Sequence, residues 1–208
     1  KMTHLELTHP GKIIAVGLNY RSHADELGMA VPSEPVIFLK PPSSVIGHGE
    51  EIIIPRASEQ VDYEAELAIV VGKTARKITV DEAASHVLGY ACANDVTARD
   101  LQRLDGQWTR SKSFDTFCPL GPWLETRPPA PEAKVELFLN GARRQSATIS
   151  DMIFSPLELV AFISGVMTLD RGDVILTGTP PGVGRMKAGD EVTVRIDGIG
   201  ELTNSVTL

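Results

Sequence analysis

The chain contains few cysteines, few aromatic residues and an excess of negative charge. Its two cysteines, Cys92 and Cys118, lie in no Cys-x-x-Cys or Cys/His cluster. Neither a disulfide framework nor a zinc site is therefore supported, and two reduced core thiols are expected. The formal net charge is −7, and no stretch concentrates Lys and Arg. This charge distribution argues against a nucleic-acid partner.

Long hydrophobic runs are also missing. The longest apolar runs have the length of a strand, and no leader-like segment opens the chain, so we expect no membrane partner and a cytoplasmic or similarly reducing location. With 208 residues, of which 42% are hydrophobic, the chain is large enough to bury a core. No repeat or linker divides it, which predicts one domain over residues 1–208.

Many short strand-like runs and few helices predict an α+β fold that is mainly β. Strands are expected at residues 12–17, 36–39, 51–54, 61–71, 87–92, 135–140, 174–176, 191–196 and 201–208. The clearest helix is Pro156–Val166, because Ser155 can cap it, Pro156 suits the first helical position, and Glu158 follows the cap by three residues.

Shorter helical stretches are expected at residues 22–27, where Gly28 ends the helix, at 80–86 and at 97–103. Residues 105–122 are rich in Gly, Ser, Lys and Asp. This composition predicts a long ordered loop, of the kind that often carries function.

The most informative segment, residues 61–71, places acidic side chains inside a run that otherwise suits a buried strand. Side chains alternate along a strand, so Asp62, Glu64 and Glu66 share one face. An ionised carboxylate removed from water needs Arg or Lys, water or a cation as its partner. A solvated edge strand is the alternative interpretation.

Two other acidic motifs have a functional and an ordinary interpretation. Asp95 follows an expected strand and is either a helix N-cap or a third inward carboxylate. His23 and Glu26 lie three residues apart on the expected short helix. They are either a His–carboxylate dyad that activates water or a solvated pair.

A glycine-rich motif and a basic motif also have both a functional and an ordinary interpretation. Residues 177–184 suit close approach of the backbone to a bound carboxylate, or an ordinary tight turn. Lys112 is a candidate cation for an anionic ligand, or a surface lysine. The Gly72-Lys73-Thr74 triplet resembles the end of a phosphate-binding loop, but Leu67 stands where that motif requires glycine.

Several motifs together, in a fixed order, resemble the fumarylacetoacetate hydrolase family. They are residues 16–20 with His23 and Glu26, 38–41, 62–67, 94–100, 112–115 and 176–180. The resemblance runs from about Lys12 to the C-terminus. It implies a mixed β-sandwich or β-roll with few short helices, usually in a homodimer. It also implies a divalent cation, Mg²⁺ or Mn²⁺, beneath a 2-oxo acid.

By motif position, Glu64, Glu66 and Asp95 match the three carboxylate metal ligands of the family. Such ligands select a hard cation and leave about three of six octahedral positions for water and substrate. Three carboxylates outweigh a divalent ion by one negative charge, so an anionic substrate needs further cations. Lys112, which matches an active-site lysine of the family, and Arg99 are the candidates.

His23 and Glu26 match the dyad that the acylpyruvate hydrolase and oxaloacetate decarboxylase branch carries on a helical lid. Gly178 and Thr179 match its substrate-contacting loop. The resemblance implies cleavage of a C–C bond in a 2-oxo acid through a metal-bound enolate of pyruvate. Such reactions are hydrolysis of an acylpyruvate or fumarylpyruvate and decarboxylation of oxaloacetate. The alternative is an isomerase or decarboxylase of the 2-hydroxyhepta-2,4-diene-1,7-dioate type in aromatic-compound catabolism.

Overall fold

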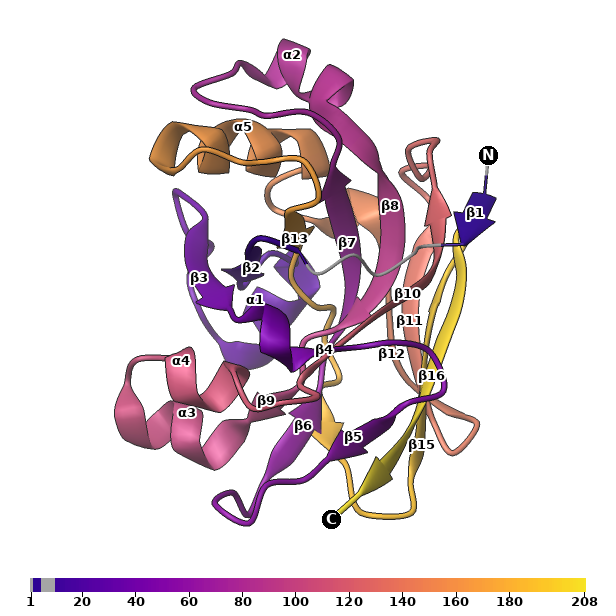
Figure 1. Cartoon of the computed structure of the whole chain (residues 1–208). Helices are drawn as coiled ribbons and strands as arrows, with labels where there is room; N and C mark the ends of the chain where they lie inside the picture. Colours follow the sequence, from indigo (N-terminus) through magenta and orange to yellow (C-terminus); the bar gives the residue numbers. More distant parts are fainter. Residues whose placement is uncertain (1, 5–9) are drawn as a thin grey trace.

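Three β-sheets with short helices between their strands make up the computed structural model, which describes residues 2–4 and 10–208 (Figure 1). The largest sheet has eight strands and runs from β1 (Met2–His4) to β3 (Val36–Lys40). At its centre, β7 (Ala65–Val71) pairs antiparallel with β8 (Val87–Asn94) and β13 (Val174–Leu176). The expected α+β fold, mainly β, is confirmed.

The other strands of this sheet extend it on both sides of β7. On one side, β2 (Ile13–Gly17) lies between β13 and β3. On the other, β10 (Cys118–Glu125) lies between β8 and β1 and also pairs with β4 (Val45–Ile46).

A five-stranded sheet packs against β7, β8 and β10. Its order is β12 (Ala142–Thr148), β11 (Lys134–Leu139), β15 (Glu191–Ile196), β16 (Gly200–Thr207) and β5 (Glu51–Ile53). All pairs are antiparallel except β16 with β5.

The acidic segment is divided between two sheets, so the expectation of one continuous strand at 61–71 is wrong. Its first part is β6 (Val61–Tyr63), which lies between β14 (Gly184–Arg185) and β9 (Thr97–Ala98) in a three-stranded sheet. The chain then passes through Glu64 and enters the large sheet as β7. The break releases the Glu64 backbone from the ladder, and its N–H donates instead to the side chain of Asn94 at 2.9 Å.

The helices are short and lie around the sheets. They are α1 (Arg21–Leu27), α2 (Val80–Ala83), α3 (Arg99–Asp105), α4 (Thr109–Lys112) and α5 (Pro156–Val166), with one-turn 3₁₀ helices η1 (Pro42–Ser44), η2 (Ala84–His86) and η3 (Ile149–Asp151). The bounds of α5 are those expected, and the Ser155–Glu158 capping box forms at its start. In the described part of the chain, no helix has the length and apolar character needed to cross a bilayer.

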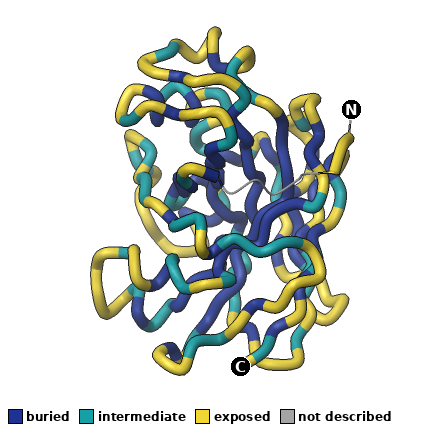
Figure 2. Tube along the Cα trace, in the orientation of Figure 1, coloured by how far each residue is buried: buried dark blue, intermediate teal, exposed yellow. Residues whose placement is uncertain are grey.

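Both faces of the central strands are buried (Figure 2). Leu67 and Ile69 belong to the cluster between the large and the five-stranded sheet, whereas Ala68 and Val70 belong to a cluster on the opposite face. Burying a Leu or Ile side chain stabilises the fold by about 1.5–3 kcal/mol. Glu66 has the same parity as Ala68 and Val70, so this charged side chain continues a buried, not a solvated, face.

Further stretches differ from expectation. Thr97 and Ala98, expected at the start of a helix, form strand β9 instead. The predicted loop at 105–122 contains α4 and the first half of β10. Pro119 and Pro122 disguise this strand, since proline disfavours a ladder, and the pairing with β8 shifts register after Gly121. The missed strand β12 is polar, because five of its seven residues are Arg, Gln, Ser or Thr. Pairing with β11 after the Asn140–Gly141 turn forms it.

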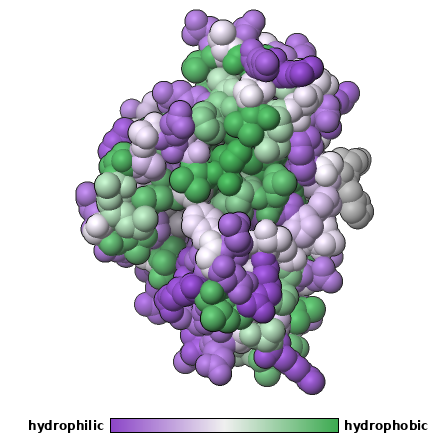
Figure 3. All heavy atoms as spheres, turned by 90° about the vertical axis from the view of Figure 1, so that its left-hand side faces the viewer, coloured by the Kyte–Doolittle hydropathy of each residue, from purple (hydrophilic) through white to green (hydrophobic). Residues whose placement is uncertain are grey.

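The side of the molecule on which β3 lies carries a broad hydrophobic area (Figure 3). Exposed large apolar side chains near this edge strand are those of Leu27, Met29, Val31, Val36 and Leu39. An apolar area beside a sheet edge is typical of a surface that another chain covers.

Candidate active site

Three buried carboxylates converge where β6 and β8 end and β7 begins. One oxygen each of Glu64, Glu66 and Asp95 lies within 4.8 Å of the other two. The Asp95 N–H donates to the Glu64 carbonyl at 2.9 Å, which holds the two segments together. Because all three side chains are buried, the solvated edge strand is the wrong interpretation.

Asp95 does not cap a helix. The next helix, α3, begins at Arg99 with Ala98 at its N-cap position. The Asp95 carboxylate instead accepts from two buried ammonium groups, those of Lys40 and Lys112, each at 2.6 Å. Of the two interpretations of Asp95, a helix N-cap or a third inward carboxylate, its position therefore agrees with the inward carboxylate.

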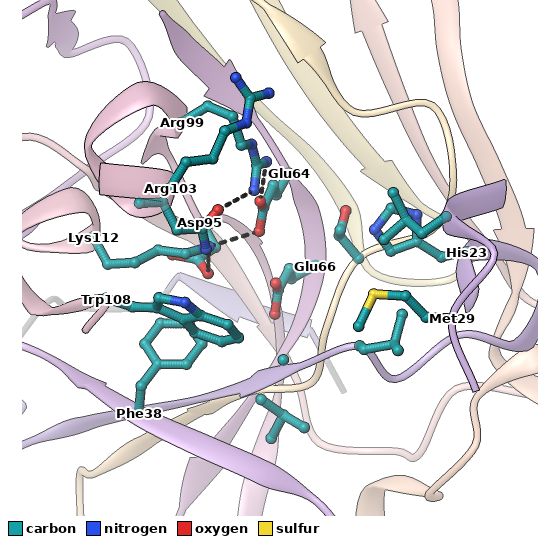
Figure 4. Close-up of a pocket in the computed structure, with 16 residues that line it drawn as sticks. His23, Met29, Phe38, Glu64, Glu66, Asp95, Arg99, Arg103, Trp108 and Lys112 are labelled. Carbon is teal, nitrogen blue, oxygen red and sulfur yellow. Dashed lines mark hydrogen bonds and ion pairs between the residues drawn. The ribbon is translucent and has the colours of Figure 1, made fainter. Parts of the chain in front are cut away.

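Lys112 and Arg99 both form an ion pair with Glu64 (Figure 4). Lys112 Nζ lies 2.8 Å from Glu64 Oε2 as well as 2.6 Å from Asp95, and with 2% exposure it is no surface lysine. Arg99 donates to Glu64 Oε1 at 2.5 Å and to Asp62 at 2.9 Å. The two cations therefore hold Glu64 from both sides.

Lys40 is a site residue that the sequence interpretation missed. It ends β3, is 1% exposed, and reaches Asp95 across 55 positions of sequence. The only local signal is a lysine at the end of an apolar strand, which a surface position would explain as well. Its burial depends on a partner that no spacing rule connects to it.

The pKa values of the two glutamates are shifted in opposite directions. Burial raises the pKa of Glu64, but the charges of Lys112 and Arg99 outweigh burial and lower it to about 2. For Glu66, burial and then the negative charges of Asp95 and Glu64 raise the pKa well above its usual value. Among the described residues, the Gly178 N–H donates a hydrogen bond to the Glu66 carboxylate at 2.6 Å. Without a cation, Glu66 therefore tends to hold a proton.

Lys112 stays charged. Burial opposes its charge, but the carboxylates of Asp95 and Glu64 raise the pKa of the ammonium. It therefore contributes positive charge and hydrogen bonds at neutral pH, and it is not a general base.

These residues fit a hard divalent cation. All three donors are carboxylate oxygens, the preferred ligands of Mg²⁺ and Mn²⁺. Glu66 is buried without an ion-pair partner in the described chain, which a cation would supply. The oxygens of Glu64 and Asp95 that accept from lysine or arginine keep further lone pairs, because each carboxylate oxygen can accept twice.

The predicted dyad forms on α1. His23 Nδ1 lies 2.9 Å from Glu26 Oε2. The Glu26 carboxylate also accepts from the Gly182 N–H, at 3.1 and 3.3 Å to its two oxygens. At the other end of α1, Ser22 donates to Asp151. The helix is thus fastened at both ends, and His23 is oriented by a carboxylate that is itself held.

The glycine-rich segment links the dyad to the carboxylates. Gly178 has φ +93°, and a side chain there would approach Asn19 Cβ to 2.7 Å, so glycine is required. Thr179 Oγ1 accepts from Gln145 Nε2 at 2.8 Å, which leaves its own hydroxyl proton free to donate elsewhere. Gln145, on the unpredicted strand β12, also accepts from Ala65 N at 2.9 Å.

A cavity of about 320 Å³ brings these groups together. Glu64, Glu66, Asp95, Lys112, Arg99, Thr179 and His23 line it. Glu26 and Gly178 do not line the cavity. They act on residues that do, because Glu26 orients His23 and the Gly178 N–H donates to Glu66. Phe38 and Trp108 form an apolar wall with an edge-to-face contact at 5.2 Å, and Lys112 Nζ lies 5.1 Å from the Phe38 ring centroid.

Comparison with known proteins assigns the chain to a family. Residues 12–207 match the model of the C-terminal domain of fumarylacetoacetate hydrolase. A protein of Archaeoglobus fulgidus is 54% identical over 196 residues, which cover 94% of this chain and 78% of the relative.

Two solved structures with described activities are similar over nearly the whole chain. The 2-hydroxyhepta-2,4-diene-1,7-dioate isomerase from Mycobacterium marinum is 44% identical with a TM-score of 0.89, covering 96% of this chain and 75% of its own. The fumarylpyruvate hydrolase from Pseudomonas aeruginosa, solved with Mn²⁺ and pyruvate, is 35% identical with a TM-score of 0.90, covering 96% and 90%. The chain belongs to the fumarylacetoacetate hydrolase family.

Proposed function

We propose that the protein cleaves a C–C bond of a 2-oxo acid with the help of Mg²⁺ or Mn²⁺ held by Glu64, Glu66 and Asp95. The observation that carries the proposal is the convergence of these buried carboxylates, within 4.8 Å, in a cavity that also contains His23 and Lys112. The Mn²⁺ and pyruvate in the related fumarylpyruvate hydrolase structure support it.

The charges of the site favour an anionic substrate once a cation is present. Four carboxylates face three cationic side chains: Asp62, Glu64, Glu66 and Asp95 against Lys40, Lys112 and Arg99. A divalent ion therefore leaves an excess of one positive charge. In a buried site such an excess attracts one carboxylate, that of the 2-oxo acid.

The bound ion would polarise the carboxylate and 2-oxo oxygens of such an acid. The chain supplies orientation and charge. Thr179 has a hydroxyl proton free to donate to the ligand, since Gln145 occupies its acceptor side. Lys112 stays protonated beside the carboxylates, where it stabilises negative charge that develops on the pyruvate part.

His23 is the general base for hydrolysis. An ionised carboxylate only accepts hydrogen bonds, so His23 Nδ1 donates to Glu26 and Nε2 carries the lone pair. Nε2 takes a proton from water, whose oxygen attacks the C4 carbonyl of a 2,4-dioxo acid. The C3–C4 bond then breaks, the acyl group leaves as a carboxylic acid, and the bond electrons and one proton give pyruvate.

Decarboxylation of oxaloacetate needs no attacking water. The same C3–C4 bond breaks with loss of CO₂, and the electron pair remains on the pyruvate part beside Lys112. His23 is therefore required for hydrolysis and dispensable for this reaction.

The second candidate is isomerisation or decarboxylation of a 2-hydroxyhepta-2,4-diene-1,7-dioate. The 44% identity to an enzyme with that isomerase activity favours it. It would use the same carboxylates and cavity. In the isomerisation a proton would move within the ligand, in the decarboxylation CO₂ would leave and a proton would replace it, and neither reaction would form pyruvate. Loss of diene absorbance without pyruvate distinguishes this reaction.

A coupled pyruvate assay on metal-stripped protein tests the proposal. Acetylpyruvate, fumarylpyruvate and oxaloacetate are offered in parallel, with Mg²⁺ or Mn²⁺ restored. We expect metal-dependent pyruvate from at least one of them. Glu66→Gln should lower the rate at least about 100-fold, because a bound metal contributes several kcal/mol.

The matched control is Glu191→Gln, which removes one exposed carboxylate from β15. It should leave the rate unchanged. Absence of pyruvate from all three substrates, with wild-type protein that still binds Mg²⁺, would contradict C–C cleavage and favour the isomerase.

We also propose a homodimer, as the family resemblance implies. The apolar area beside the edge strand β3, which includes Val36 and Leu39, supports a covered surface there. Light scattering should give twice the 22.4 kDa mass of the chain, and a monomer at micromolar concentration would contradict this proposal.

A further inference from the structure

We propose that Arg103 selects substrates with a second carboxylate at the end remote from the 2-oxo acid group. The inference rests on the proposed function, because it specifies the substrate class of that same site. It concerns a residue outside the carboxylate cluster, at the opening of the cavity.

Helix α3 presents three polar side chains to the cavity. Arg99, Gln102 and Arg103 are spaced i, i+3 and i+4 and therefore lie on one face of the helix. All three line the cavity. Arg99 is mostly buried and reaches the carboxylate cluster, whereas Arg103, one turn further along, is exposed. The helix thus carries one cation that is bound to the carboxylates and one exposed cation that also lines the cavity (Figure 4).

The two arginines differ in their partners. Arg99 is bound by the carboxylates of Asp62 and Glu64 at 2.9 and 2.5 Å. Arg103, in contrast, has no carboxylate within 4.0 Å of its guanidinium among residues 2–4 and 10–208. Its hydrogen bond goes to the neutral amide oxygen of Gln60 at 3.4 Å, near the limit for such a bond. The guanidinium is therefore available to a ligand.

Charge balance gives this free cation a role. The four carboxylates of Asp62, Glu64, Glu66 and Asp95, their three cations and one divalent ion together carry a single excess positive charge, which the first carboxylate of the substrate neutralises. Arg103 is not part of that balance. A monoacid would leave its charge facing solvent, whereas a dicarboxylate would neutralise it with a charge-assisted hydrogen bond.

The other residues near the opening do not compete for this role. Leu27 and Met29 from the α1 side and Trp108 from the α4 side also line the cavity, and they are apolar or nearly so. A carboxylate that extends past them would lose water without gaining a partner. Arg103 is the cation on that side that can receive it.

Binding of two matched ligands tests the proposal. The probes are 2-oxoglutarate and 2-oxopentanoate, which share a five-carbon 2-oxo acid and differ by one terminal carboxylate. Calorimetry with Mg²⁺-loaded protein gives the ratio of their dissociation constants. We expect 2-oxoglutarate to bind more tightly to the wild type, and Arg103→Gln to weaken it on the order of 10-fold while 2-oxopentanoate is unaffected.

Two variants separate charge from structure. Arg103→Lys keeps the positive charge and should retain part of the preference, which high salt should reduce in both proteins. Arg76→Gln removes an exposed arginine that does not line the cavity. It changes the net charge equally and should leave both dissociation constants unchanged.

A parallel assay with fumarylpyruvate and acetylpyruvate adds a kinetic measure. Arg103→Gln should raise KM for the dicarboxylate and leave kcat nearly constant, since the contact is remote from the reacting bond. Equal weakening of both ligands, or no change in either, would overturn the proposal. Preserved discrimination in binding without any pyruvate would contradict the proposed reaction alone. Pyruvate formation with no effect of Arg103 would contradict this inference alone.

Discussion

The acidic segment β6–β7 and the strand β15 have the same alternation of charged and apolar residues but opposite surroundings. In β15, Glu191 and Arg195 point to solvent, while Val192, Val194 and Ile196 are buried. Around the start of β7, the apolar residues and the charged residues Glu64 and Glu66 are all buried. A charged face is therefore solvated in one sheet and lines a cavity in the other.

The ion pairs of the two regions show what this difference means energetically. Lys112 to Asp95 and Arg195 to Glu201 are both 2.6 Å pairs. The first is almost wholly buried, and the second has side chains that are 45% and 48% exposed. Removing one partner of a buried pair leaves an uncompensated charge, whereas water replaces a lost partner at the surface. The two ion pairs have the same length, but removing one partner should destabilise the fold much more at the buried pair than at the exposed pair.

The largest effect is expected for Lys112→Met. It leaves Glu64 and Asp95 with one buried cation fewer, so the metal-free protein should lose about 3–5 kcal/mol of unfolding free energy. Chemical denaturation measures the loss. Mg²⁺ should restore part of it, because the ion neutralises the same carboxylates.

Lys73→Met is the control for this experiment, since it removes an exposed lysine two residues after the end of β7. It should change stability by less than about 0.5 kcal/mol. Equal losses in the two variants would mean that Lys112 does not neutralise a buried charge.

Local patterns were sufficient to predict much of the fold. The Ser-Pro-x-Glu signature gave α5 its bounds, and Gly28 marks the end of α1 in the left-handed conformation expected of a C-terminal glycine. Alternation also put Glu64 and Glu66 on one face. The resemblance then named Asp95 and Lys112, which the structure brings next to them.

Other features depend on contacts that are remote in sequence. Lys40 is buried because Asp95 lies opposite it, and Gln145 because it bridges Thr179 and the backbone of Ala65. Neither residue has a local pattern that differs from a surface position. Strand β12 likewise forms from polar residues only because β11 provides its ladder. Whether an alternating strand faces solvent or a cavity is decided in the same way, by what packs over it.

The next largest effect is expected at the histidine of the dyad, where a substitution should distinguish hydrolysis from decarboxylation. His23→Ala should lower hydrolysis of a 2,4-dioxo acid by about 100-fold or more, since a general base contributes at least that factor. Decarboxylation of oxaloacetate should stay within a few-fold. Steady-state assays of both substrates on one preparation measure the ratio.

His86→Ala is a suitable control, because this histidine lies in η2 and does not line the cavity. Unchanged hydrolysis in His23→Ala would remove the dyad from the mechanism. Equal loss of both reactions would give His23 a role in binding the ligand rather than in activating water.

A smaller effect concerns pH. The pKa of Glu66 is raised in the folded, metal-free protein, first by burial and then by Asp95 and Glu64. Its proton stabilises the folded state below the unfolded pKa of about 4.3, and this contribution is lost as pH rises toward the raised folded value. A cation must displace that proton. Apparent Mg²⁺ affinity should therefore increase about tenfold per pH unit in this window, or about 1.4 kcal/mol.

Thermal unfolding with and without Mg²⁺ across this pH range measures the trend. The stabilisation by Mg²⁺ should increase with pH in the wild type. In Glu66→Gln, which has no proton to release at this position, the metal effect should be weak and independent of pH. An equally steep trend in that variant would assign the proton to another group.

The smallest effect is expected on the exposed strand. Glu201→Gln removes the partner of Arg195 and leaves the contact of Arg195 with the Phe138 ring, 4.7 Å from the centroid, in place. Because water solvates the freed guanidinium, the unfolding free energy should fall by less than about 1 kcal/mol, and salt should remove most of the difference. Denaturation at low and high ionic strength measures both. A loss as large as that of Lys112→Met would mean that distance, and not burial, sets the strength of the two pairs.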